Sequence, residues 1–305
     1  MVRSIWEDAK REFSYGNMVT RIIIINVAVF VLINLVRIVL FIGNGGEPSP
    51  LFQEIIRFFS MSSDWSHVLT HPWVIITSMF LHEGFFHILF NMLFIYWFGR
   101  IVADFIGNQR ILPIYLLGGV AGAILYFVTA NLLPYGQGGV SYALGASAGV
   151  MAIVVAAGAI APDYIMRLLL LGDIKLKYIV AALVFLDLVA ATGYTNTGGA
   201  FAHLGGALFG WVFIRQLQSG NDWAHPVNSF LDKVSNFFQG LGGSHSKKGP
   251  RVVYRNTSGR QRTDKASPDQ SYQERLDTIL DKIKQSGYES LSESEKEFLF
   301  NASKK

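Results

Sequence analysis

Four polar residues in otherwise apolar segments carry the side chains needed to cleave an amide bond. Ser147 lies in GASAG and His203 lies in AHLGGALFG. His87 and Asn91 are four residues apart in HEGFFHILFNM, so they share one face of a helix. A serine hydroxyl becomes an effective nucleophile when a neighbouring base takes its proton, and histidine suits that role near neutral pH. We therefore predict a catalytic dyad in which Ser147 is the nucleophile and His203 is its base.

The same reaction needs hydrogen-bond donors for the oxyanion that forms when the carbonyl is attacked. His87, the side-chain amide of Asn91 and the backbone N–H of Ser147 are the predicted donors. Each of these residues also has a structural interpretation. Ser147 could be a small packing residue, His203 a buried histidine with a hydrogen-bonded ring, and the other two could hold neighbouring helices together.

An acidic partner for the histidine is not predicted. No acidic residue lies near this level in the segments that carry Ser147, His203 or His87, so a dyad fits better than a triad. Asp187 lies in another apolar segment, where we expect it to bond to a neighbouring Thr or Tyr or to be protonated. A proton-relay role in a transporter is the alternative for Asp187.

A metal site is also not predicted. The zinc motif His-Glu-x-x-His needs two histidines four residues apart. In HEGFFH, His82 and His87 are five apart, which places them about 140° from each other around a helix. The chain has no cysteine, so neither a disulfide nor a cysteine-based metal site can form. No cofactor is expected.

The segments around these residues are apolar enough to cross a membrane. The chain is 51% hydrophobic and 16% charged, whereas soluble domains carry about 25% charged residues. A bilayer core needs roughly 20 apolar residues in a helix. Six segments qualify or nearly qualify, and we predict an all-α bundle of six transmembrane helices in which the short, Gly- and Ala-rich fourth and sixth lie inside. The segments are 18–42, 78–99, 111–132, 143–161, 176–193 and 200–217.

The distribution of basic residues predicts the orientation. If the N-terminus is cytoplasmic, 24 of the 26 lysine and arginine residues fall on the inside, as the positive-inside rule requires. Helices two, four and six then run from outside to inside. Ser147, His203 and His87 lie within the first turns of these helices, and therefore at a similar depth near the outer face. This shared depth favours chemistry over three separate packing roles.

Small residues are predicted to let the fourth and sixth helices approach each other closely, because glycines four apart do this in membranes. A side chain as short as that of Ser147 could then reach His203. The glycines are Gly145 and Gly149 in the fourth helix and Gly206 and Gly210 in the sixth.

The remaining segments are predicted to lie on the cytoplasmic side. Residues 1–17 are polar, of mixed charge and without signal-peptide features, so they are expected to form an N-terminal tail. Residues 218–268 are rich in Ser, Gly, Asn and Lys and are expected to be a flexible linker between the core, 18–217, and the C-terminal segment. Residues 269–305 regain helical periodicity, and Ser292 with Glu295 forms a capping-box pattern. We expect a small helical hairpin there. It could bind a cytoplasmic partner, mediate self-association, sense a signal or have no effect on catalysis.

At this point residues 70–217 resemble the rhomboid family of intramembrane proteases. HEGFFHILFNM resembles the family's second-helix pattern, which ends in H-x-x-x-N, and FGRIVADFIGNQR followed by Tyr115 resembles the stretch after that helix. GASAG resembles the G-x-S-x serine motif, and AHLGGALFG resembles the A-H-x-x-G segment. The resemblance implies a Ser147–His203 dyad with His87 and Asn91 in the oxyanion hole. It also implies transmembrane-helix substrates cut near the outer face, a mobile cap at 193–199 and a lateral gate at the fifth helix.

Three positions depart from the family's pattern. Trp73 is followed by Val74, where the family often has Trp-Arg. Met151 stands one turn after the serine, where an aromatic residue often packs on the catalytic histidine; methionine packs there more loosely. Asp104 stands where a glutamate is common.

Two classes of function follow from these patterns. The first is a serine endopeptidase embedded in the lipid bilayer, with membrane proteins as substrates and no nucleic-acid partner. The second is a non-catalytic membrane protein, either a binder of transmembrane segments or a transporter. The lack of organelle targeting and the architecture predict a multi-pass protein of a bacterial cytoplasmic membrane.

Overall fold

A computed structural model describes residues 7, 13, 16–168, 171–193, 196–241 and 268–302. The chain divides into two units, Met1–Ser244 and His245–Lys305. Most of the predicted tail, 1–17, and residues 242–267 of the predicted linker lie outside the described residues.

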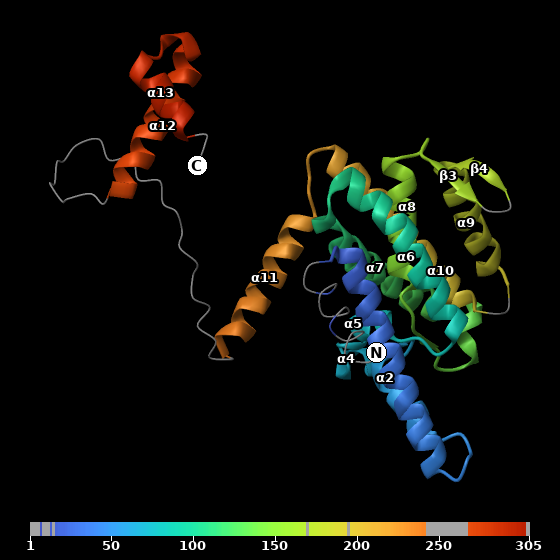
Figure 1. The fold of residues 1–305 in the computed structure, drawn as a ribbon. Helices are drawn as coiled ribbons and strands as arrows, with labels where there is room; N and C mark the ends of the chain where they lie inside the picture. The colour runs from blue at the N-terminus through green and yellow to red at the C-terminus, as the bar shows by residue number, and fades with distance from the viewer. Residues whose placement is uncertain are drawn as a thin grey trace. The chain divides into compact units, whose positions relative to one another are not determined.

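The first unit is a bundle whose long helices correspond in order to the six predicted segments (Figure 1). Its mostly helical character agrees with the predicted all-α class. The six helices are α2 (Met18–Gly43), α6 (Phe85–Ile106), α7 (Ile111–Leu132), α8 (Ser147–Ile160), α9 (Leu176–Ala191) and α10 (Thr197–Gln218).

Four of these helices are long and apolar enough to cross a membrane by length and composition, namely α2, α6, α7 with its preceding turn, and α10. In α2, only three of the 26 residues are buried although the helix is apolar all round, as expected where lipid replaces water. The other two predicted spans, α8 and α9, have 14 and 16 residues. Both are shorter than the roughly 20 residues that a full crossing needs.

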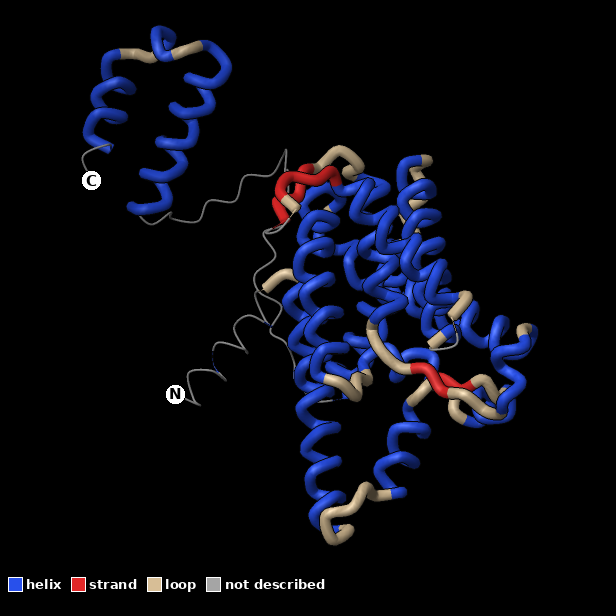
Figure 2. Tube along the Cα trace, turned by 90° about the vertical axis from the view of Figure 1, so that its right-hand side faces the viewer, coloured by secondary structure: helices blue, strands red, loops and turns tan. Residues whose placement is uncertain are grey.

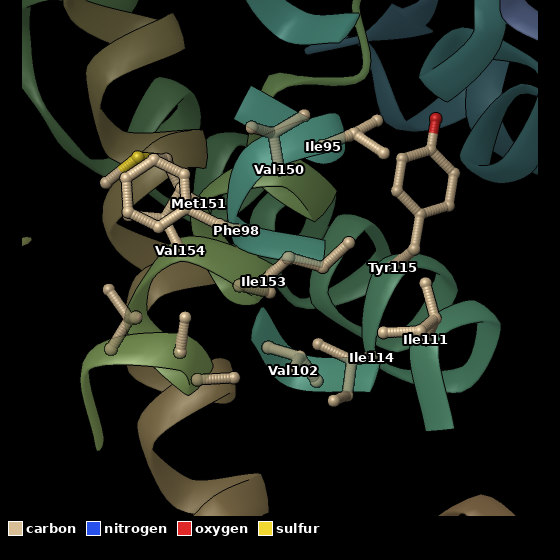
Figure 3. Close-up of a cluster of buried hydrophobic side chains, with 14 of the residues drawn as sticks. Ile95, Phe98, Val102, Ile111, Ile114, Tyr115, Val150, Met151, Ile153 and Val154 are labelled. Carbon is tan, nitrogen blue, oxygen red and sulfur yellow. The ribbon is translucent and has the colours of Figure 1, made fainter. Parts of the chain in front are cut away.

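Helix α8 lies inside the bundle, as predicted for the fourth segment. It contacts α6, α7, α9 and α10, and every residue from Ala148 to Ala157 is buried. Small and branched side chains of α8 fill the space between its neighbours, and Figure 3 shows this core with side chains from α6, α7 and α8. The labelled members are Ile95, Phe98, Val102, Ile111, Ile114, Tyr115, Val150, Met151, Ile153 and Val154.

Two short strand pairs lie at opposite ends of the bundle (Figure 2). Strand β1 (Met61–Ser62) pairs antiparallel with β2 (Tyr142–Ala143), which joins the first long loop to the segment before α8. Strands β3 (Ile165–Leu168) and β4 (Gly172–Lys175) form an antiparallel pair between α8 and α9. The first long loop also contains α3 (Pro50–Phe59), α4 (Trp65–Thr70), α5 (Val74–Thr77) and the 3₁₀ turn η1 (Ser78–Phe80). Two further 3₁₀ turns flank α7, namely η2 (Asn108–Arg110) before it and η3 (Pro134–Gly138) after it.

Two predicted helix starts were wrong, for local reasons. The second helix begins at Phe85 and not at 78, because Gly84 is extended and the preceding residues leave the helical conformation. The fourth begins at Ser147 and not at 143, because Ala143 is paired in β2 and Gly145 has a φ of 125°. Ser147 is therefore the first residue of its helix.

The predicted linker contains a helix, which corrects the assignment of 218–268 as flexible throughout. Helix α11 spans Ala224–Leu241. Its apolar residues recur at helical spacing at Phe230, Val234 and Phe237, a pattern that the polar composition obscured. The start of α11 is fixed by a salt bridge of 2.7 Å between Arg110 and Asp222.

The second unit contains α12 (Pro268–Ser286), the turn η4 (Tyr288–Ser290) and α13 (Glu293–Ala302). Gly287 has a φ of 78° and ends α12. The carboxylate of Glu295 accepts from the backbone N–H of Ser292 at 2.7 Å, which is one half of the predicted capping box. Lys282 of α12 donates to the same carboxylate at 2.9 Å, so the two helices are joined by an ion pair.

Candidate active site

Ser147 follows a loop whose backbone is held from two sides. Strand β2 is paired with β1, and the N–H of Gly145 donates to the carbonyl of Ser78 at 2.8 Å. The φ of Gly145, 125°, is a conformation that residues with a side chain rarely adopt. A Cβ at this position would lie 2.7 Å from Cε1 of His87 and 3.7 Å from Oγ of Ser147. Glycine therefore leaves room for the imidazole beside the serine.

His87 and Asn91 lie one turn apart at the start of α6, as their spacing predicted. The Asn91 amide nitrogen donates to the carbonyl of His87 at 2.9 Å and lies 3.3 Å from Nε2 of His82. The Asn91 side chain is thereby fixed in position, with the residue only 6% exposed.

His82 is a site residue that the sequence patterns did not identify. It is buried, and its Nε2 accepts from the backbone N–H of Ala146 at 3.3 Å. This histidine links Asn91 to the residue immediately before Ser147. The signal in the sequence is a histidine in the largely apolar segment that contains HEGFFH.

His203 lies in the second turn of α10, and its Nδ1 is 2.8 Å from Oδ1 of Asp187. The partner of Asp187 is therefore His203 and not the neighbouring Thr or Tyr that we expected. Helices α9 and α10 are consecutive and joined by a short loop. Positions at equal distances from that loop lie at the same depth, so Asp187 near the end of α9 lies at the level of His203 near the start of α10.

The residues of the predicted dyad, Ser147 and His203, line one cavity of about 630 Å³ together with the predicted oxyanion-hole residues His87 and Asn91. Ser147 and Met151 come from α8, His203 from α10, and Asp187 from α9. The polar lining consists of Glu83, His87, Asn91, Tyr142, Ser147, Asp187, Asn196 and His203. The apolar lining comes largely from α6 and α9, through Phe86, Phe90, Phe94, Leu183 and Leu186. The cavity thus combines a serine hydroxyl, two histidine rings and an asparagine amide with an apolar wall.

The predicted glycines divide into three roles. Gly206 and Gly210 of α10 pack directly on the backbone carbonyls of Ala148 and Ala152 in α8, which is the close approach predicted for the fourth and sixth helices. Gly149 faces α7, where an added Cβ would lie 2.6 Å from the carbonyl oxygen of Tyr115.

Gly145 precedes α8, so the predicted stripe of Gly145 with Gly149 does not exist as one helix face. The reason is the left-handed turn described above, which delays the start of the helix. Met151, one turn after Ser147, is buried and lines the cavity as expected for a residue beside the site.

Two segments of the chain match known protein families. Residues 69–218 match the rhomboid domain, and residues 269–305 match a family of unknown function (DUF6576). The chain is 32% identical to RHOMBOID-like protein 6, mitochondrial, of Arabidopsis thaliana over 54% of this chain and 52% of that protein. It is 28% identical to presenilin-associated rhomboid-like protein A, mitochondrial, of Danio rerio over 54% of this chain and 42% of that protein. It is 30% identical to rhomboid protease GluP of Bacillus subtilis over 46% of this chain and 25% of that protein.

The chain spans about half or less of the length of these relatives. Two of the three are named as mitochondrial, so the comparisons do not support the predicted bacterial cytoplasmic membrane. The domain match and the shared similarity to rhomboid-like proteins nevertheless agree on one assignment: the chain belongs to the rhomboid family.

Proposed function

We propose that this protein is an intramembrane serine endopeptidase that cleaves transmembrane-helix substrates near the outer face of the membrane. The observation that carries the proposal is the shared cavity, which Ser147, His203, His87 and Asn91 all line although they come from three helices. A bacterial relative that is named as a rhomboid protease supports the same reaction class.

In the proposed reaction, Oγ of Ser147 attacks the substrate carbonyl while His203 takes the hydroxyl proton. Because Nδ1 of His203 is engaged by Asp187, Nε2 is the nitrogen available as the base. As the peptide C–N bond then breaks, His203 gives this proton to the leaving amine and an acyl-enzyme remains. A water molecule that His203 activates in the same way hydrolyses the acyl-enzyme, which releases the carboxyl product and restores the serine hydroxyl.

The oxyanion would be stabilised by His87, by the Asn91 amide and by the N–H of Ser147. Ser147 is the first residue of α8, and helices provide no internal acceptor for their first N–H groups. This N–H is therefore free of the helix ladder and points from the positive end of the helix dipole.

The apolar wall indicates the substrate class. Phenylalanines of α6 and leucines of α9 line the cavity beside the polar groups. A membrane-spanning substrate could place its helix against this wall and extend a short unwound segment toward Ser147. In this proposal α9 acts as the lateral gate and 193–199 as the cap; residues 194 and 195 lie outside the described part of the chain.

We further propose six membrane crossings with both termini on the inner side, which follows from the distribution of basic residues. In this arrangement α8 would not reach the outer surface, and the cavity beside Ser147 would admit water from that side. Residues 18–217 form the protease core, and the segments before and after it are cytoplasmic.

The proposal is tested with the full chain in proteoliposomes. The substrate is a transmembrane helix with helix-destabilising residues near its outer end, and a fluorophosphonate labels the active serine. We expect cleavage and labelling by the wild-type protein, loss of both in Ser147→Ala and His203→Ala, and neither loss in the control Ser219→Ala. A well-folded wild-type protein that neither cleaves nor is labelled would refute the proposal.

A further inference from the structure

We propose that Asp187 is a positioning residue that orients His203 for the reaction proposed above, on which this inference rests. The two side chains come from consecutive helices, α9 and α10, and meet at the edge of the cavity that holds Ser147.

The geometry is that of a directed hydrogen bond. Oδ1 of Asp187 and Nδ1 of His203 are 2.8 Å apart, within the range of charge-assisted hydrogen bonds between histidine and carboxylate. The side chains are 18% and 23% exposed, respectively, so the contact is largely shielded from solvent and is less weakened than a surface pair would be.

A carboxylate at Nδ1 selects one tautomer of the imidazole. A carboxylate has no proton to donate, so Nδ1 carries the proton and Nε2 keeps its lone pair. The ring orientation is fixed at the same time, because the hydrogen bond restricts rotation about the Cβ–Cγ bond. When His203 accepts the serine proton, the carboxylate also stabilises the imidazolium that forms, which is the role of the acidic residue in serine-protease triads.

The other groups near His203 are less able to orient its imidazole ring. Met151 lines the cavity one turn after Ser147, and its thioether is at most a weak hydrogen-bond acceptor. The other titratable groups that line the cavity are Glu83 just before α6, His87 in α6 and Tyr142 in β2. Among the described residues, the hydrogen-bond partner that the structure assigns to the His203 ring is Asp187.

The position of Asp187 also points to a function. Ionisable residues in membrane helices are costly and are retained where they have a partner and a task. If the carboxylate only held α9 against α10, its role would be structural and its removal would not affect the chemical step. The two roles predict different effects on kcat when the carboxylate is removed, and this difference makes the proposal testable.

The experiment compares Asp187→Asn with wild type in the proteoliposome assay, with Asp173→Asn as the matched control. Asp173 forms an exposed ion pair with Arg167 in the β3–β4 hairpin, away from the cavity. We expect Asp187→Asn to lower kcat by tenfold or more, because general-base catalysis contributes about 10²–10⁴-fold and a misoriented base loses part of this contribution. We expect KM to stay within about twofold, because the apolar wall is unchanged. We expect Asp173→Asn to match wild type. A kcat for Asp187→Asn within twofold of wild type overturns the proposal, whatever the change in thermal stability.

A second measurement requires neither a folded Asp187→Asn variant nor cleavage of a substrate. Proton NMR of the full chain with ¹⁵N-labelled histidine is expected to show a strongly downfield Nδ1–H of His203 in wild type and in Ser147→Ala. Its absence from both proteins overturns the proposed hydrogen bond. If wild type shows this resonance but cleaves nothing and is not labelled by the fluorophosphonate, the proposed function fails and the proposed reaction role of Asp187 fails with it. Cleavage that is lost in Ser147→Ala but unchanged in Asp187→Asn overturns only the role of Asp187.

Discussion

Gly206 of α10 lies against the backbone carbonyl of Ala148 in α8, with no space for a Cβ between them. The next residue toward the site on α8 is Ser147, and His203 lies one turn before Gly206. The distance between the proposed nucleophile and its base is therefore set by how closely two helix backbones approach, because neither side chain is long.

Gly206→Ala should separate α10 from α8. The added methyl group meets backbone, which cannot rotate away, so overpacking is expected to cost about 1–3 kcal/mol of stability. We also expect proteolysis to fall by at least tenfold, because a shift of about 1 Å at a catalytic group can cost about 100-fold. The control is Gly43→Ala at the end of α2, where nothing lies within 4 Å of the added Cβ. Cleavage rates and melting temperatures of the two variants in detergent check the prediction, and equal behaviour of both would contradict it.

Gly145→Ala should impair the oxyanion side of the site. Its Cβ would lie 2.7 Å from His87, at a φ of 125° that already strains an alanine. Gly139→Ala is a matched control, because Gly139 has a φ of 117° but no atom within 4 Å of an added Cβ. We expect both variants to lose stability and only Gly145→Ala to lose at least tenfold in the rate of fluorophosphonate labelling. Similar labelling rates would show that the contact with His87 has no catalytic effect.

Removal of the second unit should leave the reaction intact. The residues that line the cavity end at His203, and the bundle is closed on the C-terminal side by the Arg110–Asp222 salt bridge before α11. A chain ending after Leu241 is expected to cleave the test substrate within twofold of the full chain. Asp222→Ala in the same truncated chain should lower its melting temperature, since Arg110 then loses its partner. A truncated chain that inserts correctly but is inactive would assign a role in catalysis to residues 242–305.

Acid should loosen the contact between α12 and α13. The hydrogen bond from Lys282, followed by the backbone N–H of Ser292, lowers the pKa of Glu295 from 4.5 to about 2. A carboxyl group whose pKa is lower in the folded state stabilises the fold fully above its unfolded pKa, and this contribution is lost as the pH falls from about 4.5 toward about 2. Amide exchange in 292–298 of the full chain, corrected for intrinsic rates, should increase over this window. In Glu295→Gln it should already be fast at pH 6, whereas Glu297→Gln should resemble wild type.

Much of the site could be predicted from the sequence because helix period and membrane depth are properties of a single chain segment. Such local rules account for the one-turn spacing of His87 and Asn91 and for the positions of Ser147 and His203 near the starts of their helices. They also account for the close helix packing at Gly206 and Gly210. The family resemblance rested on the same residues, and the domain match over 69–218 agrees with it.

Other features were decided by tertiary structure. Gly145 was assigned to a helix face by its spacing, but strand pairing between β1 and β2 and the bond to Ser78 place it in a turn. His82 belongs to the site only because the loop before α6 folds back onto the N–H of Ala146. Asp187 meets His203 because α9 is rotated so that this side chain faces α10. Sequence spacing determines the depth of a residue along its helix, whereas rotation about the helix axis is set by packing against neighbours that are distant in the chain.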